Sequence, residues 1–296
     1  MRPLFQFTPA QYWRAFLLAG LAAGASVWAG PASKTTRVPS EFVQFGEPDQ
    51  AKGAEILAEF RNLGIAGDYY LQFELRVMPR RGDEVIYAGR LWGSRNETGP
   101  ISRVVLEDGQ GEVHRLLIQS GSAPRIWNWR PGQASPEVMP ADGVYRPLLA
   151  GTELTPFDLL MPYLYWDEFV FEGVSKVLGR AAHTFRLQPP AEDPADDGRL
   201  AAVRVQLDTQ FRAMVQSELL DAKGEPYKSL TLRDLKKVGD QWMIKAIGLR
   251  NEQTRDKTRF QVVRAAVGLD LSPTVFDAAS LAEEIKPPAN TEFLGR

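Results

Sequence analysis

The sequence predicts a mainly β fold of the α+β class. We expect a strongly curved antiparallel sheet, or unclosed β-barrel, of about 11 strands with short helices covering its concave face. Between residues 68 and 129, and again between 167 and 267, apolar and polar side chains alternate as in half-buried strands. The turns between these runs are too short for crossover helices, so neighbouring strands must be antiparallel. A sheet of this size must curl or close to hide its apolar face.

Composition and the N-terminus indicate an exported globular protein. Of the 296 residues, 44% are hydrophobic, and the formal net charge of -2 argues against a general nucleic-acid binder. Residues 1–29 resemble a cleaved signal peptide, with Arg2 and Arg14 as the positive charges and a cut before Gly30. An uncleaved anchor is the alternative. The absence of cysteine excludes disulfides, and an exported chain without them fits a bacterial periplasm.

In the first half of the chain, after the leader, the sequence predicts a linker, a helix and a series of strands. Residues 30–47 are rich in Pro, Ser and Thr, and the main domain is predicted over 48–286. Ile56, Leu57 and Phe60 form one apolar stripe on a helix predicted over residues 48–63. Strands are then predicted at residues 68–78, 84–95, 101–107, 112–120 and 125–129.

The middle of the chain breaks the alternation. Residues 131–149 read as a loop, and residues 154–166 as a short helical segment that is apolar nearly all round. Thr155 suits the N-cap, and Asp158 suits the third helical position, where its charge meets free amides. Two interpretations of this segment stay open: a core plug, or a lid over a hydrophobic cavity.

The second half reads as a hairpin, a loop and a long meander. Residues 189–198 are acidic and rich in proline, and Asp277 is a plausible cap for a last short helix. Residues 287–296 are predicted to form a tail. The strands are predicted at residues 167–177, 180–188, 200–208, 211–221, 227–238, 241–250 and 257–267.

Residue patterns typical of catalysis are missing from the sequence. His114 and His183 lie in predicted strands without metal-site spacing, and we interpret both as structural. The sequence contains neither a Gly-x-Ser-x-Gly elbow nor a phosphate-binding glycine loop. We therefore expect no enzyme activity, no metal and no cofactor. Trp127 and Trp129 share one face of a strand, where they form either an aromatic ligand wall or part of the core.

Several segments together carry a resemblance to a known family. They are a helix at residues 48–63, the Trp-rich strand Arg125–Trp129, the Thr-x-x-Asp-Leu helix Thr155–Leu159, the turns Gly224–Lys228 and Asp240–Trp242, and the closing segment Pro273–Leu281. In these segments the chain resembles the outer-membrane lipoprotein-sorting protein family, which includes the LolA/LolB carriers. The resemblance implies an unclosed barrel whose apolar hollow holds lipoprotein acyl chains.

These observations lead to a functional hypothesis. We expect a periplasmic carrier that binds acyl chains of lipoproteins or lipids, with an inner-membrane transporter or an outer-membrane acceptor as partner. Each buried methylene contributes about 0.8 kcal/mol, so an apolar cavity holds a lipid tail without a polar anchor. The alternative is a non-catalytic sensor or adaptor that binds an envelope protein. Periodicity and the resemblance together select the following cavity residues: Leu71, Phe73, Leu75, Trp127, Trp129, Phe157, Leu160, Met161 and Tyr163.

Overall fold

One antiparallel sheet of 14 strands organises the part of the chain that this computed structural model describes, residues 46–191, 195–211 and 213–295. The predicted leader and most of the predicted linker lie outside these residues. The strands are β1 (Asp68–Met78), β2 (Val85–Arg95), β3 (Pro100–Glu107), β4 (Val113–Gln119), β5 (Arg125–Trp129), β6 (Glu137–Val138), β7 (Phe169–Val177), β8 (Arg180–Leu187), β9 (Ala202–Asp208), β10 (Met214–Leu220), β11 (Pro226–Val238), β12 (Gln241–Asn251), β13 (Lys257–Leu269) and β14 (Glu292–Phe293).

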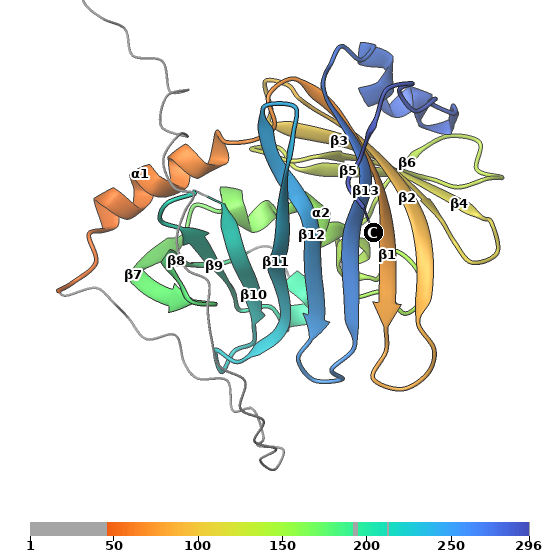
Figure 1. Ribbon diagram of the computed structural model, residues 1–296. Helices are drawn as coiled ribbons and strands as arrows, with labels where there is room; N and C mark the ends of the chain where they lie inside the picture. Colours follow the sequence, from red (N-terminus) through yellow and green to blue (C-terminus); the bar gives the residue numbers. More distant parts are fainter. Residues whose placement is uncertain (1–45, 192–194, 212, 296) are drawn as a thin grey trace, which may run out of the picture. The chain divides into compact units, whose positions relative to one another are not determined.

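The strand order joins two meanders into one sheet. Across the sheet the order is β6-β5-β4-β3-β2-β1-β13-β12-β11-β10-β9-β8-β7, and β14 pairs with β13 (Figure 1). All these pairs are antiparallel, and the two end strands β6 and β7 leave the sheet unclosed. The predicted antiparallel, unclosed sheet is therefore confirmed. The long-range pairing of β1 with β13 holds the two meanders together.

The strand count corrects the prediction of about 11. Strands β6 and β14 have two residues each, which is too short for alternation to be visible in a sequence. Strand β14 lies within the segment predicted as a tail. Its register pairs Phe293 with Arg264, and the adjoining Leu294 is buried in the main core.

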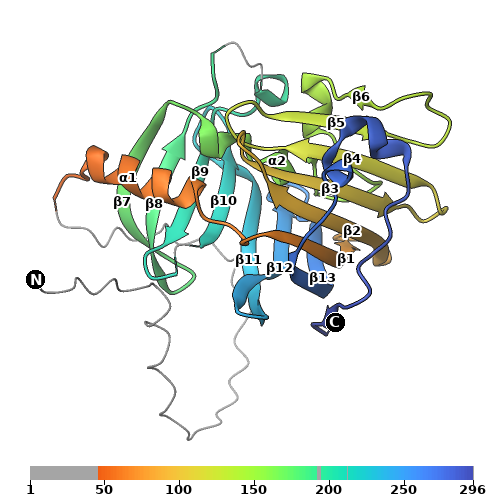
Figure 2. The same ribbon diagram turned by 90° about the horizontal axis from the view of Figure 1, so that it is seen from above.

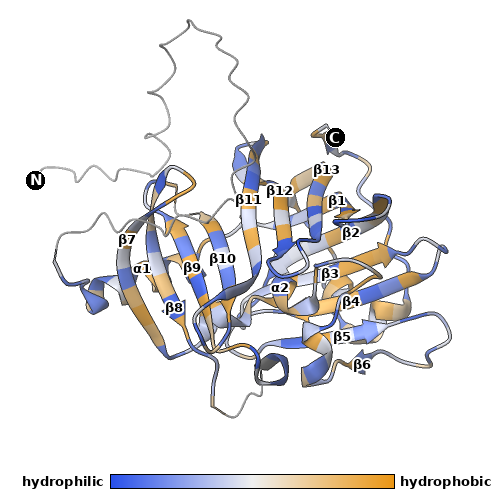
Figure 3. Cartoon of the chain, turned by 90° about the horizontal axis from the view of Figure 1, so that it is seen from below, coloured by the Kyte–Doolittle hydropathy of each residue, from blue (hydrophilic) through white to orange (hydrophobic). Residues whose placement is uncertain are grey.

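The apolar face of β1 carries Leu71, Phe73 and Leu75, and we call this side of the sheet the inner face. Side chains of β2 to β5 and β11 to β13 join the same core, and apolar and polar residues alternate along the strands (Figure 3). The chain between β6 and β7 packs against this face, with Leu154 among its core residues. That chain contains the 3-10 turn η2 (Ala141–Tyr145), the helix α2 (Pro156–Leu160) and the 3-10 turn η3 (Pro162–Tyr165).

Glycines in β2 make room for the large rings of β1. Gly89 lies opposite Phe73, and an added Cβ at Gly89 would lie 2.2 Å from the Phe73 ring. Gly93 stands in the same relation to Tyr69, at 2.1 Å. Phe73 also stacks on Phe260 of β13 with ring centroids 4.4 Å apart. The missing side chains in β2 thus allow an aromatic layer on the inner face.

Helix α1 (Gln50–Arg61) lies at the β7 end of the sheet (Figure 1). Asp49 caps it by accepting the backbone N–H groups of Ala51 and Lys52. The Gln50 side chain donates to the Phe171 carbonyl and accepts its N–H, both at 2.9 Å, so it covers part of the edge strand β7.

The outer face, opposite to Leu71 and Phe73, is covered at one end by the C-terminal segment. This segment contains the 3-10 turns η5 (Pro273–Phe276) and η6 (Ala278–Ala282), which run along β3 to β5 (Figure 2). The predicted cap Asp277 accepts the Ala279 N–H, but the predicted helix is divided into these two short turns. Short helical segments therefore cover both faces of the sheet, which corrects the expectation that they gather on one.

Candidate functional site

The short helix α2 is fixed to the sheet by a buried polar group. The Asp158 carboxylate accepts the Thr155 N–H and hydroxyl, both at 2.8 Å. Lys228 of β11 donates to the same carboxylate at 2.5 Å, and both side chains of this ion pair are more than 90% buried. The predicted roles of Thr155 and Asp158 are confirmed. Met161, with a φ of 47°, ends the helix, and Pro162 begins the next turn.

The structure distributes the predicted cavity residues over three places. One core cluster on the inner face holds the β1 side chains and Leu160 of α2. A second inner-face cluster, beside β7 to β10, contains Phe157 and Tyr163, with Met161 packed at its border. Trp127 and Trp129 lie on the outer face with Leu281 of η6. The two tryptophans and the β1 side chains are therefore on opposite sides of the sheet.

The inner face of β1 to β4 is filled by protein side chains. Leu149, Leu154 and Leu160 from the segment between β6 and β7 pack against the strands, and each is at most 6% exposed. Side chains packed in this way leave little space for a ligand without rearrangement. At these three positions the segment is part of the core, as the plug interpretation expects.

The second cluster contains a group of aromatic rings around Phe157. Phe157 lies within 4.9 to 6.4 Å of Tyr145, Tyr163 and Trp166, measured between ring centroids. Burial raises the pKa of Tyr163, whose hydroxyl lies 3.4 Å from the Ser217 hydroxyl. The cluster continues to Phe171 and Leu207, which line an open cleft.

That cleft lies between α1 and strands β7 to β9 and has a volume of about 350 Å³. This volume is at the lower end of the range found for small-molecule sites. The lining of the cleft contains both apolar and polar side chains. Its apolar residues are Ile56, Phe60, Phe171, Val174 and Leu207, and its polar residues are Asp49, Lys52, Glu59, His183, Asp208 and Thr209.

The sequence contained the signal for only part of this cleft. The stripe containing Ile56 and Phe60 predicted that α1 covers an apolar surface, and the structure shows that surface on β7 to β9. Val174 was not predicted to take part. A register shift between Phe171 and Gly173 in β7 turns Val174 toward the cleft, and bulges of this kind are not visible in alternation.

His183 of β8 joins the cleft lining as a neutral side chain. Burial lowers the pKa of His183, and the nearby Lys52 charge lowers it further. Its Nδ1 is buried without a hydrogen-bond partner among the described residues. The folded state thus favours the uncharged ring. Stability that is present above the usual histidine pKa of about 6.5 is lost as the pH falls from there toward the lowered value.

We expect His183→Gln to flatten the dependence of unfolding free energy on pH between about pH 7 and pH 5. The wild-type chain should lose stability as the pH falls, because the unfolded chain binds a proton that the folded chain resists. Urea titrations at several pH values measure this slope. Part of the slope remains in the variant, because burial also lowers the pKa of His114. Equal slopes for wild type and variant contradict this prediction.

A second group of polar side chains lies in the turn between β3 and β4 and at the start of β4. Asp108, Glu112 and His114 offer ligand atoms within 4.8 Å of one another. One Asp108 oxygen accepts the backbone N–H groups of Gln110 and Glu112, each at 2.8 Å. These bonds close the turn and lower the pKa of Asp108, so a structural role accounts for the grouping.

The open sheet with a helix across one end is a fold that this chain shares with several solved structures. An outer membrane lipoprotein-sorting protein domain from Vibrio parahaemolyticus is similar, with a TM-score of 0.67 and 19% identity over 79% of this chain and 99% of that chain. A DUF1329 family protein from Desulfovibrio piger gives a TM-score of 0.67, 12% identity and coverages of 80% and 100%. A LolA superfamily protein from Nitrosomonas europaea gives a TM-score of 0.58 and 11% identity, over 76% of this chain and 96% of that chain.

At the level of sequence, residues 116–283 match a family model described as "Uncharacterized protein", and the chain belongs to this family. The matched segment is more than half of the chain and runs from β4 to the end of η6. No curated protein matches the sequence. Among the described residues, no helix is both long and apolar enough to cross a membrane.

Proposed function

We propose that this protein is a periplasmic carrier that binds one acyl chain of a lipoprotein or lipid beneath α1. The observation that carries the proposal is the cleft between α1 and β7 to β9, which is lined by both apolar and charged side chains. The shared fold with a lipoprotein-sorting domain supports the same class of function. An inner-membrane transporter as donor or an outer-membrane protein as acceptor would complete the pathway.

The chemistry of the cleft suits a ligand with an apolar tail. Ile56 and Phe60 line it from the helix, and Phe171 and Leu207 line it from the sheet. Each methylene that enters such a site contributes about 0.8 kcal/mol. Among the polar residues that line the cleft, Lys52 is exposed and pairs with Glu55 at 2.7 Å, and we expect it to contact the ligand's polar end.

Helix α1 is fastened near both ends, with the cleft lining between. At its start the Gln50 amide bonds to the β7 backbone, and an added Cβ on Gly53 would lie 2.5 Å from the Phe171 side chain. At its end Arg61 donates to the carbonyls of Leu164 and Trp166. A tail longer than the cleft requires movement of the aromatic side chains beyond it, which include the predicted cavity residues Phe157 and Tyr163.

The test compares two aspartate substitutions on α1. Ile56→Asp places a carboxylate in the cleft, whereas Ala58→Asp places the same charge on the exposed side of the helix. We expect Ile56→Asp to weaken binding of a fluorescent fatty acid at least tenfold, which corresponds to about 1.4 kcal/mol. Ala58→Asp should bind like the wild type.

Native mass spectrometry of the full chain after periplasmic expression provides the second measurement. Retained lipid in the wild type and loss of it in Ile56→Asp support the carrier. No lipid in the wild type, together with equal probe binding by both variants, would exclude it.

The filled inner face of β1 to β4 favours a second candidate, the non-catalytic adaptor that binds an envelope protein. Core side chains such as Leu149 and Leu154 occupy the space that a larger cargo would need. Strand β7 is a sheet edge, and its exposed Val170 lies beside the position that Gln50 covers. A stable protein partner that co-purifies without lipid, and is lost on Val170→Asp, would favour the adaptor over the carrier.

A further inference from the structure

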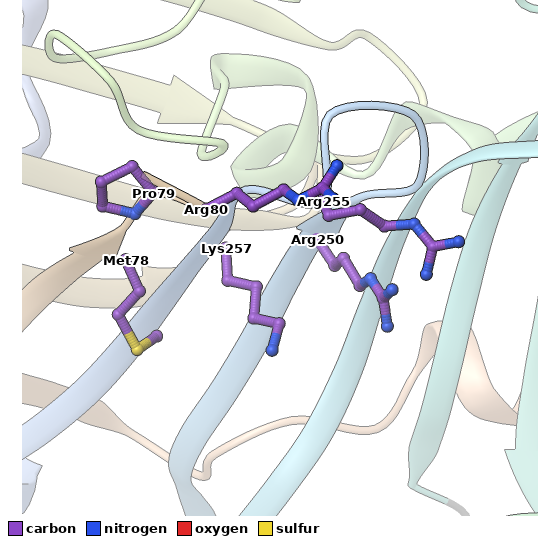
Figure 4. Close-up of a pocket in the computed structure, with 6 residues that line it drawn as sticks. All are labelled: Met78, Pro79, Arg80, Arg250, Arg255 and Lys257. Atoms are coloured by element: carbon purple, nitrogen blue, oxygen red, sulfur yellow. The ribbon is translucent and has the colours of Figure 1, made fainter. Parts of the chain in front are cut away.

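A second pocket lies on the outer face, at the end of the sheet where two hairpin turns meet. Its volume is about 510 Å³, and it is lined by four basic residues with Met78 and Pro79 beside them (Figure 4). The basic residues are Arg80, Arg250, Arg255 and Lys257. The turn between β1 and β2 supplies Arg80, and the turn between β12 and β13 supplies Arg255.

The strand register brings three of these residues together. Met78 of β1 lies directly opposite Lys257 of β13, and Lys257 lies opposite Arg250 of β12. Side chains in directly opposite positions are close neighbours on one face of a sheet, where like charges repel. The pairing of Lys257 with Arg250 thus contributes no stability to the sheet by itself.

Cations farther along the same face have acidic partners. Arg186 and Arg204 both lie 3.6 Å from Glu172, and Arg204 also lies 3.1 Å from Glu218. These ion pairs neutralise the charge on β7 to β10.

Most of the basic residues that line the pocket have no acidic partner of this kind among the described residues. Arg250 lies 3.4 Å from Glu252, but among the described residues no ion pair joins Arg80, Arg255 or Lys257 to an acid. The pocket is therefore a concentration of positive charge next to a neutralised surface.

Hydrogen bonds between the turns hold this group in place. Asp256 accepts the backbone N–H of Arg80 at 2.7 Å, which ties one turn to the other. Its pKa is lowered by a hydrogen bond from Thr254, by the Arg80 N–H and by the Arg80 charge. The Asn251 side chain accepts two backbone N–H groups of its own turn. The Asp256 carboxylate is thus engaged by donors within and between the two turns.

We infer that this pocket binds a phosphate group carried by a larger molecule. Arginine side chains present planar forks of donors that match phosphate oxygens, and lysine adds a compact charge. The volume exceeds what a single phosphate needs, and Met78 and Pro79 offer apolar contact to the rest of the molecule. A soluble phosphate ester and a phospholipid headgroup share this chemistry. The pocket lies on the face of the sheet opposite to the cleft under α1, so the inference does not rest on the proposed carrier function.

The experiment uses the full chain and two sources of phosphate. Glycerol 3-phosphate is titrated calorimetrically, and vesicles of phosphatidylglycerol or of phosphatidylcholine are tested by co-sedimentation, each at low and high salt. Lys257→Ser and Arg255→Ser remove pocket charges. Lys237→Ser removes the same charge from an exposed position of β11 outside the pocket. Thermal unfolding by circular dichroism establishes that the three variants are folded.

We expect each pocket variant to weaken binding at least tenfold, the control variant to bind like the wild type, and high salt to weaken binding in all chains. Binding of glycerol 3-phosphate identifies a soluble ester as ligand. Binding only to phosphatidylglycerol vesicles identifies a headgroup. No binding in either arm overturns the inference, as does an equal loss in Lys237→Ser, which would reflect net charge alone.

Discussion

Replacing Asp158 by alanine is expected to lower the free energy of unfolding by roughly 3–5 kcal/mol, the cost of breaking a buried ion pair. The carboxylate accepts from Lys228 at 2.5 Å and from the Thr155 N–H and hydroxyl. Its removal leaves a lysine ammonium, only 9% exposed at its side chain, without its ion-pair partner. It also removes a bond that organises the first turn of α2. Urea unfolding at pH 7 measures the loss.

A double-mutant cycle separates the charge from the cap. Asp158→Asn keeps the shape of the side chain but removes the ion-pair partner of Lys228, so it should approach the alanine variant in stability. Adding Lys228→Met to Asp158→Ala should restore part of the loss, because the buried ammonium is gone. If the double variant is as unstable as the sum of the single changes, the two side chains do not interact in the way described.

Replacing Arg103 by alanine should lower the free energy of unfolding by about 3 kcal/mol or more, because it leaves a cavity and removes the hydrogen-bond donor of several carbonyls. Arg103 is fully buried in β3 on the outer face. Its guanidinium donates to the Ser280 hydroxyl and to the carbonyls of Ser280 and Leu281, each at 3.1 Å. Burial and, to a smaller extent, the neighbouring Arg115 lower the pKa of Arg103 to about 10, so the group is charged at neutral pH.

Detachment of the C-terminal segment is the specific sign of this loss. Protease cleavage between residues 272 and 285 should become faster in Arg103→Ala, and tryptophan fluorescence should change because Trp127 and Trp129 pack against this segment. Arg103→Lys keeps the charge but lacks the forked donors, so it should fall between wild type and alanine. Unchanged cleavage in Arg103→Ala would show that other contacts hold the segment.

Local patterns predicted most of the strands and the start of α2. Alternation in Asp68–Met78 identified β1, and Thr155 with Asp158 identified the N-terminus of α2, because these signals lie within a few neighbouring residues. The same patterns did not show the partner of Asp158. Lys228 lies 70 residues away along the chain, and only the packing of β11 behind α2 brings it there.

The sites depended on the sheet as a whole. Trp127 and Trp129 lie on the same face of their strand. The pairing of β5 with β4 decides that this face is on the outer side of the sheet. The cleft under α1 depends on the register shift that turns Val174 inward. The basic pocket depends on strands from the two ends of the chain lying side by side.

The sequence by itself determined the class of the fold, because side-chain period and turn length act over a few residues. Tertiary structure alone decided which face each strand buries, where α1 and the C-terminal segment lie, and which charges gather without partners. Those features arise from contacts between residues far apart in the chain, such as the pairing of β1 with β13, and no local pattern records them.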